Sequence, residues 1–167
     1  MTQPHLYDAG ALIAMDRNHR RMWARYQVAL DDGRDIRVPA VVVGQAWRDS
    51  RRQVRLGQFL VGCHVDPVGL ETSKAAGILC GRAGTSDVVD ATVVVMAAAT
   101  GALIWTSDPE DIKALADESG ARPPLVIRAA EPLVTPRGVV MVIMFVIGSL
   151  AIIIFLQPSR RNWRSTG

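Results

Sequence analysis

The sequence has few of the residues on which cysteine- and histidine-based chemistry depends. Its two cysteines, Cys63 and Cys80, have no CxxC or Cys/His spacing, so the sequence predicts neither a disulfide scaffold nor a cysteine-based zinc site. The three histidines, His5, His19 and His64, are scattered along the chain and give no zinc-binding pattern. A GxSxG elbow and a P-loop lysine motif are also missing, which argues against serine hydrolases and P-loop nucleotide hydrolases.

Lysine is scarce as well, because Lys74 and Lys113 are the only two and arginine supplies the other positive charges. Residues 1–130 carry 15 Lys/Arg and 15 Asp/Glu, so the net charge of +3 comes from residues 131–167. Guanidinium groups suit phosphate contacts. Two groups of arginines could therefore line a path for RNA, or they could form solvated helix faces paired with nearby aspartates. The arginines are Arg17, Arg20, Arg21 and Arg25 in the first group, and Arg48, Arg51, Arg52 and Arg55 in the second.

Strand-like and helix-like segments alternate through the first 130 residues. We expect a short strand at the start of HLYDAG (residues 5–10) and another in IRVPAVVV (residues 36–43), which runs into a helix. Further strands are expected over residues 63–68, 102–108 and 124–128, with helical segments between the strands. Thr85 and Ser86 would cap a central, Val-rich helix over residues 86–99. Such alternation predicts an α/β fold around a parallel sheet.

Four aspartates stand where apolar runs end or where helices begin: Asp8, Asp87, Asp90 and Asp108. The carboxyl ends of parallel strands meet at one edge of a sheet, so these acids are expected to converge there. Converging carboxylates suit a hard divalent cation. A helix cap is the alternative explanation for Asp87 and for Asp108, since acids are favoured at helix starts. Asp111 is the substitute if Asp108 points away.

Four phrases resemble those of PIN-domain ribonucleases, in particular VapC-like toxins of toxin–antitoxin pairs. They are YDAGALIA, RVPAVVVGQAWR, SDVVDATVVVMAA and LIWTSDPEDI, and the resemblance covers residues 5–129. It implies a three-layer α/β/α domain with a short parallel sheet. It also implies a Mg²⁺ or Mn²⁺ site held by Asp8, Asp90 and Asp108, with Asp87 as a further catalytic acid.

The same resemblance implies an activity and partners. The activity would be metal-dependent endoribonuclease cleavage of an RNA such as tRNA. The partners would be a cognate antitoxin and a second copy of the chain in a homodimer. Thr106 or Ser107 would orient a carboxylate or a metal-bound water by hydrogen bonding. One departure is Gln45, which stands where many PIN nucleases have a glutamate. An amide accepts hydrogen bonds but supplies no charge, so either a single metal is held or Asp87 compensates.

The segment of residues 138–156 is apolar and has no charged residue. In a helix it would nearly span the hydrocarbon core of a bilayer, so the sequence predicts a transmembrane helix there. Residues 131–137 would be a linker and residues 157–167 a basic tail. The N-terminus lacks the pattern of a signal peptide, so the nuclease domain is expected in the cytoplasm, anchored by this helix. The basic tail favours the cytoplasmic side for the C-terminus too, and one span cannot satisfy both.

The sequence thus predicts a metal-dependent ribonuclease toxin with a membrane anchor. Two other hypotheses stay open. A catalytically degenerate PIN-like binding module on the membrane would use its aspartates only as helix caps. A soluble toxin with an extension of no function would behave identically without residues 131–167.

Overall fold

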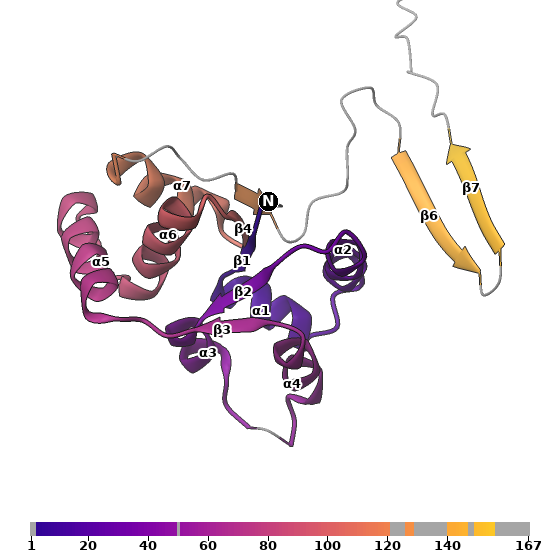
Figure 1. Cartoon of the computed structure of the whole chain (residues 1–167), viewed down its shortest axis with the longest axis horizontal. Helices are drawn as coiled ribbons and strands as arrows, with labels where there is room; N and C mark the ends of the chain where they lie inside the picture. The colour runs from indigo at the N-terminus through magenta and orange to yellow at the C-terminus, as the bar shows by residue number, and fades with distance from the viewer. Residues whose placement is uncertain (1–2, 50, 121–125, 129–139, 147–148, 156–167) are drawn as a thin grey trace, which may run out of the picture. The chain divides into compact units, whose positions relative to one another are not determined.

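The computed structural model describes residues 3–49, 51–120, 126–128, 140–146 and 149–155. The chain divides into two compact units, residues 1–130 and residues 131–167. Each unit is described by itself (Figure 1).

The first unit is built on a five-stranded sheet in which every neighbouring pair of strands is parallel. The strand order is β3-β2-β1-β4-β5. The strands are β1 (His5–Tyr7), β2 (Ile36–Pro39), β3 (His64–Asp66), β4 (Leu103–Thr106) and β5 (Val126–Arg128). The predicted α/β fold with a short parallel sheet is confirmed. The central strands β1 and β4 are neighbours, so the residues that follow them meet at one edge.

Helices cover both faces of this sheet, as the three-layer prediction requires (Figure 1). On one side, α1 contacts α2, α3 and α4; on the other, α5, α6 and α7 pack against one another. Their bounds are α1 (Ala9–Asp16), α2 (Arg20–Asp31), α3 (Ala40–Ala46), α4 (Val54–Val61), α5 (Leu70–Ala83), α6 (Val88–Thr100) and α7 (Pro109–Glu118). The α5 and α6 helices end at glycines with positive φ, Gly84 and Gly101, where an L side chain would be strained.

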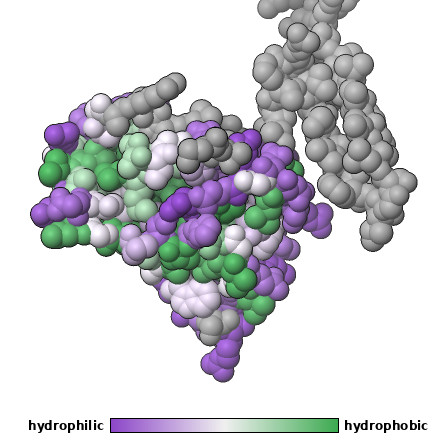
Figure 2. Space-filling view, in the orientation of Figure 1, coloured by the Kyte–Doolittle hydropathy of each residue, from purple (hydrophilic) through white to green (hydrophobic). Residues whose placement is uncertain are grey.

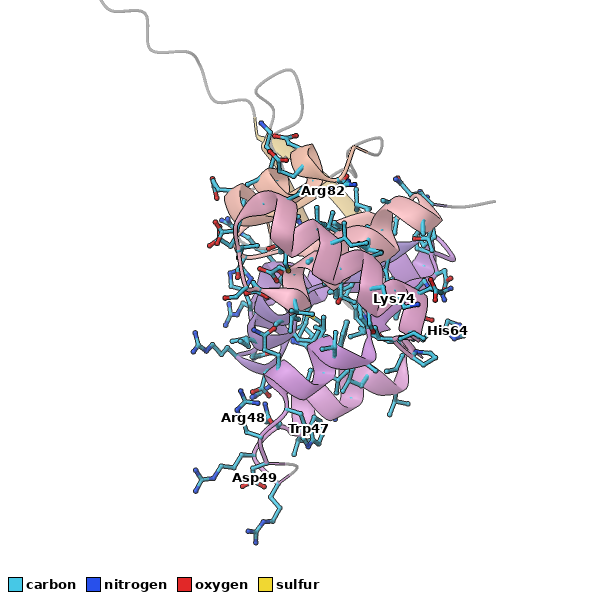
Figure 3. The ribbon with its side chains drawn as sticks, turned by 90° about the vertical axis from the view of Figure 1, so that its left-hand side faces the viewer. Trp47, Arg48, Asp49, His64, Lys74 and Arg82 are labelled. Carbon is cyan, nitrogen blue, oxygen red and sulfur yellow. The ribbon has the colours of Figure 1, made fainter. Side chains whose placement is uncertain are left out.

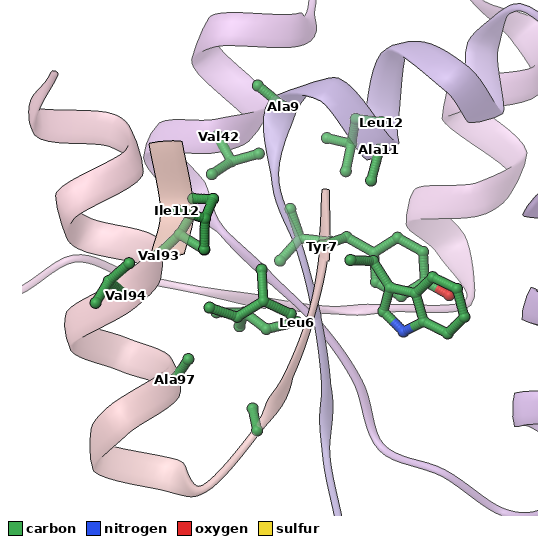
Figure 4. Close-up of a cluster of buried hydrophobic side chains, with 14 of the residues drawn as sticks. Leu6, Tyr7, Ala9, Ala11, Leu12, Val42, Val93, Val94, Ala97 and Ile112 are labelled. Carbon is green, nitrogen blue, oxygen red and sulfur yellow. The ribbon is translucent and has the colours of Figure 1, made fainter. Parts of the chain in front are cut away.

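The core lies on both faces of the central strand, because successive side chains of a strand point to opposite sides. Leu6 faces the apolar side of α6, where Val94 lies, and Tyr7 points the other way (Figure 4). The Tyr7 ring lies 5.0 Å from that of Phe59 and 5.8 Å from that of Trp105, measured between centroids. Leu6 and Tyr7 have no exposed surface, so β1 is anchored rigidly just before Asp8.

The second unit corrects one prediction. Instead of a single helix over residues 138–156, the structure has two antiparallel strands, β6 (Val140–Val146) and β7 (Ser149–Phe155). An apolar run does not separate helix from strand by periodicity. β-branched residues are frequent in both halves of this run, a composition that favours strands. The predicted linker and basic tail lie outside the described residues.

Among the residues that the structure describes, no single helix has the length and apolar character needed to cross a membrane. The pair α5 and α6 passes that test only jointly, and the two helices are bent by 113° at their junction.

Candidate metal and catalytic site

Asp8 is the buried acid at the centre of the site, with 4% of its surface exposed. It directly follows β1, and its backbone N–H donates to the Trp105 carbonyl of the neighbouring strand at 3.0 Å. Its carboxylate also caps α1, because Oδ1 accepts from the Ala11 N–H at 2.6 Å. Burial, above all, raises the pKa of Asp8 from 3.8 to about 6, and the nearby Asp108 carboxylate adds to this increase. The hydrogen bonds of the carboxylate act in the opposite direction.

Thr106 links Asp8 to the loop that carries Asp108. The Thr106 side chain is fully buried and hydrogen-bonds the Asp8 carboxylate. The same hydroxyl oxygen accepts from the Asp108 N–H at 2.9 Å. Thr106 therefore contacts both the Asp8 carboxylate and the Asp108 backbone.

Asp108 precedes α7, but its side chain makes no capping hydrogen bond to that helix. The capping explanation for Asp108 is thus wrong for its carboxylate, which is exposed and contributes to the raised pKa values of both Asp8 and Asp90. The Asp108 carboxylate is therefore available to bind a ligand.

Asp87 is the N-cap of α6, because its Oδ1 accepts from the N–H groups of Val89 and Asp90 at 3.1 and 3.0 Å. The capping explanation is therefore correct for Asp87, and Asp87 rather than Thr85 or Ser86 caps this helix. Its charge still reaches the site, since it raises the pKa of Asp90. Asp87 combines a structural role with an electrostatic one.

Asp90 lies in the first turn of α6 and is partly buried. Its pKa is raised from 3.8 to about 6, first by burial and then by the charges of Asp87, Asp8, Asp111 and Asp108, in that order. Every one of these causes acts in the same direction, and none of them is a basic group. Acids from three separate parts of the chain therefore converge, as the sequence predicts, and Asp111 joins them.

The acidic cluster (Asp8, Asp87, Asp90, Asp108 and Asp111) suits a hard cation by its chemistry, because carboxylate oxygen is the ligand such ions prefer. Within the described part of the chain, no three acidic, histidine or cysteine side chains are arranged as a direct ligand set. Mg²⁺ does not require such a set, because it keeps several of its waters and needs only one or two direct carboxylates. Asp8, Asp90 and Asp108 supply carboxylate oxygens of the kind that such an ion prefers.

Ser107 is placed by close packing on the start of α1. A Cβ added to Gly10 would lie 1.9 Å from the Ser107 Oγ and 2.9 Å from its Cβ, so only glycine lets the loop after β4 approach α1 this closely. Sequence reasoning missed this role of Gly10. Gln45 is exposed on α3, the helix that follows β2 and packs against α1. Its side chain makes no hydrogen bond to any described residue.

Comparison with solved structures gives the class of the fold. A chain of VapBC2 from Rickettsia felis, bound to a DNA fragment from their promoter, is 12% identical with a TM-score of 0.57, covering 75% of this chain and 98% of that one. A chain of DNA-bound VapBC from Salmonella typhimurium is 12% identical with a TM-score of 0.57, covering 77% and 99%. PAE2754 from Pyrobaculum aerophilum is 14% identical with a TM-score of 0.51, covering 75% and 92%.

These matches are to VapC- and FitB-type PIN domains, so the predicted resemblance to PIN domains is confirmed for the fold. At such low identity, structural likeness establishes the fold alone. No family model matches the sequence, and no curated protein matches it. The activity must therefore be argued from the acidic cluster.

Proposed function

We propose that this protein is a metal-dependent endoribonuclease of the PIN type and the toxin component of a toxin–antitoxin pair. One observation carries the proposal: carboxylates from the ends of β1 and β4 and from the start of α6 converge with no basic group among the causes of the raised pKa of Asp90. Acids used only as caps or ion-pair partners would not converge in this way. A cation is the natural counter-charge for such a cluster.

Asp8, Asp90 and Asp108 would hold Mg²⁺ or Mn²⁺, which when bound activates water and stabilises negative charge on a phosphate. Asp8 is fixed by its bonds to Ala11 and Thr106 and provides the rigid point of the site. Asp108 is exposed, so its carboxylate can adjust to an ion.

The neighbouring polar groups would complete the site. The Asp87 carboxylate adds negative charge, and Thr106 and Ser107 orient the acids. Gln45, exposed on α3, would accept hydrogen bonds from water but carries no charge, and this favours one ion over two.

The structural neighbours support the proposal that this chain is the toxin component of a toxin–antitoxin pair. VapBC2, VapBC and FitAB are complexes of two components, each solved with DNA. By analogy, we propose that this chain binds a cognate antitoxin that covers the acidic cluster, and that it pairs with a second copy of itself. The substrate would be a folded RNA such as tRNA.

The test is cleavage of total tRNA by the full-length chain, freed of antitoxin, with Mg²⁺ or Mn²⁺ and with EDTA. Asp90→Asn serves as the inactive variant, and Asp117→Asn, an exposed acid near the end of α7, as the control. Metal-dependent cleavage that Asp90→Asn abolishes and Asp117→Asn retains is the expected result. A folded sample that cleaves no RNA under any of these conditions would favour the degenerate binding module.

Residues 138–156 carry a separate proposal, which is that they attach a cytoplasmic nuclease domain to a membrane. The support comes from the sequence, which has no charged residue in this segment and places Arg137, Arg160, Arg161 and Arg164 on its two sides. Interfacial arginines are typical of membrane-associated segments. Flotation of the full-length chain with lipid vesicles tests this proposal. Recovery only in the lipid-free fraction would contradict it.

A further inference from the structure

The α3–α4 connection carries a concentration of positive charge that the acidic cluster does not use. Residues 47–53 contain three arginines against one aspartate, Asp49, and a fourth arginine, Arg55, follows in the first turn of α4. The connection forms the lower tip of the first unit in Figure 1, and the same tip is hydrophilic in Figure 2. Figure 3 shows Arg48 and Asp49 at this tip.

Two of these arginines are almost completely exposed, with 93% of the Arg51 side chain and 89% of the Arg52 side chain accessible to solvent. Their nearest acid is Asp49, at 4.0 Å from the Arg51 Nε and 3.8 Å from the Arg52 Nε. Exposed ion pairs this long contribute little. Asp49 is also used inside the loop, where its Oδ1 accepts from the Arg51 N–H at 3.0 Å. Both guanidinium groups therefore remain available to an external anion.

Arg48 differs from these two because it is used within the fold. Its Nη1 donates to the carbonyls of Trp47 at 2.7 Å and Gly44 at 3.3 Å, which satisfies carbonyl groups at the end of α3. Trp47 packs against the core, so it is not available to stack on a base. The exposed positive charge of the loop comes from Arg51 and Arg52, with exposed Arg55 beside them in α4.

A buried amide holds this loop in place. The Gln53 side chain, 9% exposed, donates from Nε2 to the Ala46 carbonyl at 3.0 Å and to the Asp16 carboxylate at 3.3 Å. Its Oε1 accepts from the N–H groups of Arg48 and Asp49. The loop is therefore tied to the last residue of α1. Asp8 caps the other end of this eight-residue helix, about 12 Å away at 1.5 Å per residue.

We propose that Arg51 and Arg52 form a phosphate-binding platform for the RNA strand whose scissile phosphate lies at the acidic cluster. This rests on the proposed nuclease function. Arg51 and Arg52, next to the anchored Gln53 and one helix length from the acids, would contact the RNA backbone outside the reacting phosphodiester. Guanidinium groups are well suited to phosphate, and no aromatic group is presented with them. The platform therefore positions RNA without reading its bases.

The test measures RNA binding separately from cleavage. The full-length chain is titrated against fluorescein-labelled single-stranded RNA in EDTA, over a series of NaCl concentrations, with anisotropy as the readout. The double variant Arg51→Gln/Arg52→Gln is compared with Arg20→Gln/Arg21→Gln, an adjacent exposed pair on α2. Removing two phosphate contacts should reduce the slope of log K against log[salt] by about 1.4, at roughly 0.7 per contact for single strands. The α2 pair should leave the slope unchanged.

Cleavage in Mg²⁺ by the same proteins separates the two proposals. Loss of the platform should raise KM and leave kcat near that of the wild type. If the wild type binds RNA through Arg51 and Arg52 but does not cleave it, the nuclease proposal is refuted and the platform proposal stands. If the wild type cleaves RNA and the double variant Arg51→Gln/Arg52→Gln has the same slope of log K against log[salt], the platform proposal is refuted and the nuclease proposal stands. An equal decrease for the α2 pair would also overturn the platform, since binding would then follow total charge.

Discussion

Asp90 is expected to lower the stability of the metal-free protein at neutral pH. Its pKa is raised from 3.8 to about 6 by burial and by four other carboxylates. Above pH 6 the ionised Asp90 carboxylate therefore costs more free energy in the folded state than in the unfolded chain. A shift of about 2 pKa units corresponds to about 3 kcal/mol. Because Asp90 is only partly buried and its charge also favours the first turn of α6, we reduce this to roughly 1–2 kcal/mol.

Replacing Asp90 with asparagine should therefore stabilise the apo protein at pH 7.5 by roughly 1–2 kcal/mol, or about 3–8 °C in melting temperature. As pH falls from about 6 towards 3.8, the folded wild type takes up its proton before the unfolded chain does. The wild type then gains stability, so the advantage of Asp90→Asn should shrink by more than half at pH 4.5.

Urea unfolding in EDTA, followed by tryptophan fluorescence, measures this difference at the two pH values. Trp105 lies in the core of the first unit and reports on its unfolding. Asp117→Asn is the control, and it should change stability little at either pH. If Asp90→Asn proves destabilising by the same amount at both pH values, the electrostatic account of the cluster is wrong.

Three further predictions concern the same site. Mg²⁺ or Mn²⁺ at 100 times its dissociation constant should stabilise the wild type by about 2.7 kcal/mol and should have much less effect on Asp90→Asn, as thermal melts will show. Thr106→Val should cost about 1–3 kcal/mol in urea unfolding, because it leaves buried hydrogen-bonding groups without a partner, whereas Thr106→Ser should retain most of the stability. Gly10→Ala should reduce cleavage by displacing Ser107; unaltered cleavage in Gly10→Ala would contradict this packing argument.

Much of the fold could be predicted because local patterns and tertiary packing agree in the first unit. Apolar runs ending at Asp8 and Asp108, and helical periodicity between them, led to the observed strands and helices. The convergence of the acids could also be predicted, since it follows from strand order in a parallel sheet. An orienting role for Thr106 or Ser107 stays a prediction from their position beside Asp108.

Other features depend on tertiary contacts that no short sequence pattern reveals. The close approach of Ser107 to Gly10 joins two loops about a hundred residues apart. The four hydrogen bonds of Gln53 likewise unite α1, the end of α3 and the arginine loop. In the second unit, the helix prediction relied on a charge-free apolar run, and overall apolarity gives no information on whether β-branched residues form a helix or strands.

The acids of the cluster differ in what the fold would lose without them. Asp8 and Asp87 cap α1 and α6 through their carboxylates, so their replacement would damage helices as well as the site. The Asp90 carboxylate accepts no hydrogen bond from a described residue, and Asp108 makes no side-chain cap. A relative of the proposed nuclease that abandoned catalysis would therefore lose Asp90 or Asp108 first, and loss of Asp90 would make the metal-free fold more stable at neutral pH. Descendants with an inactive site should be recognised by neutral residues at these two positions beside intact caps.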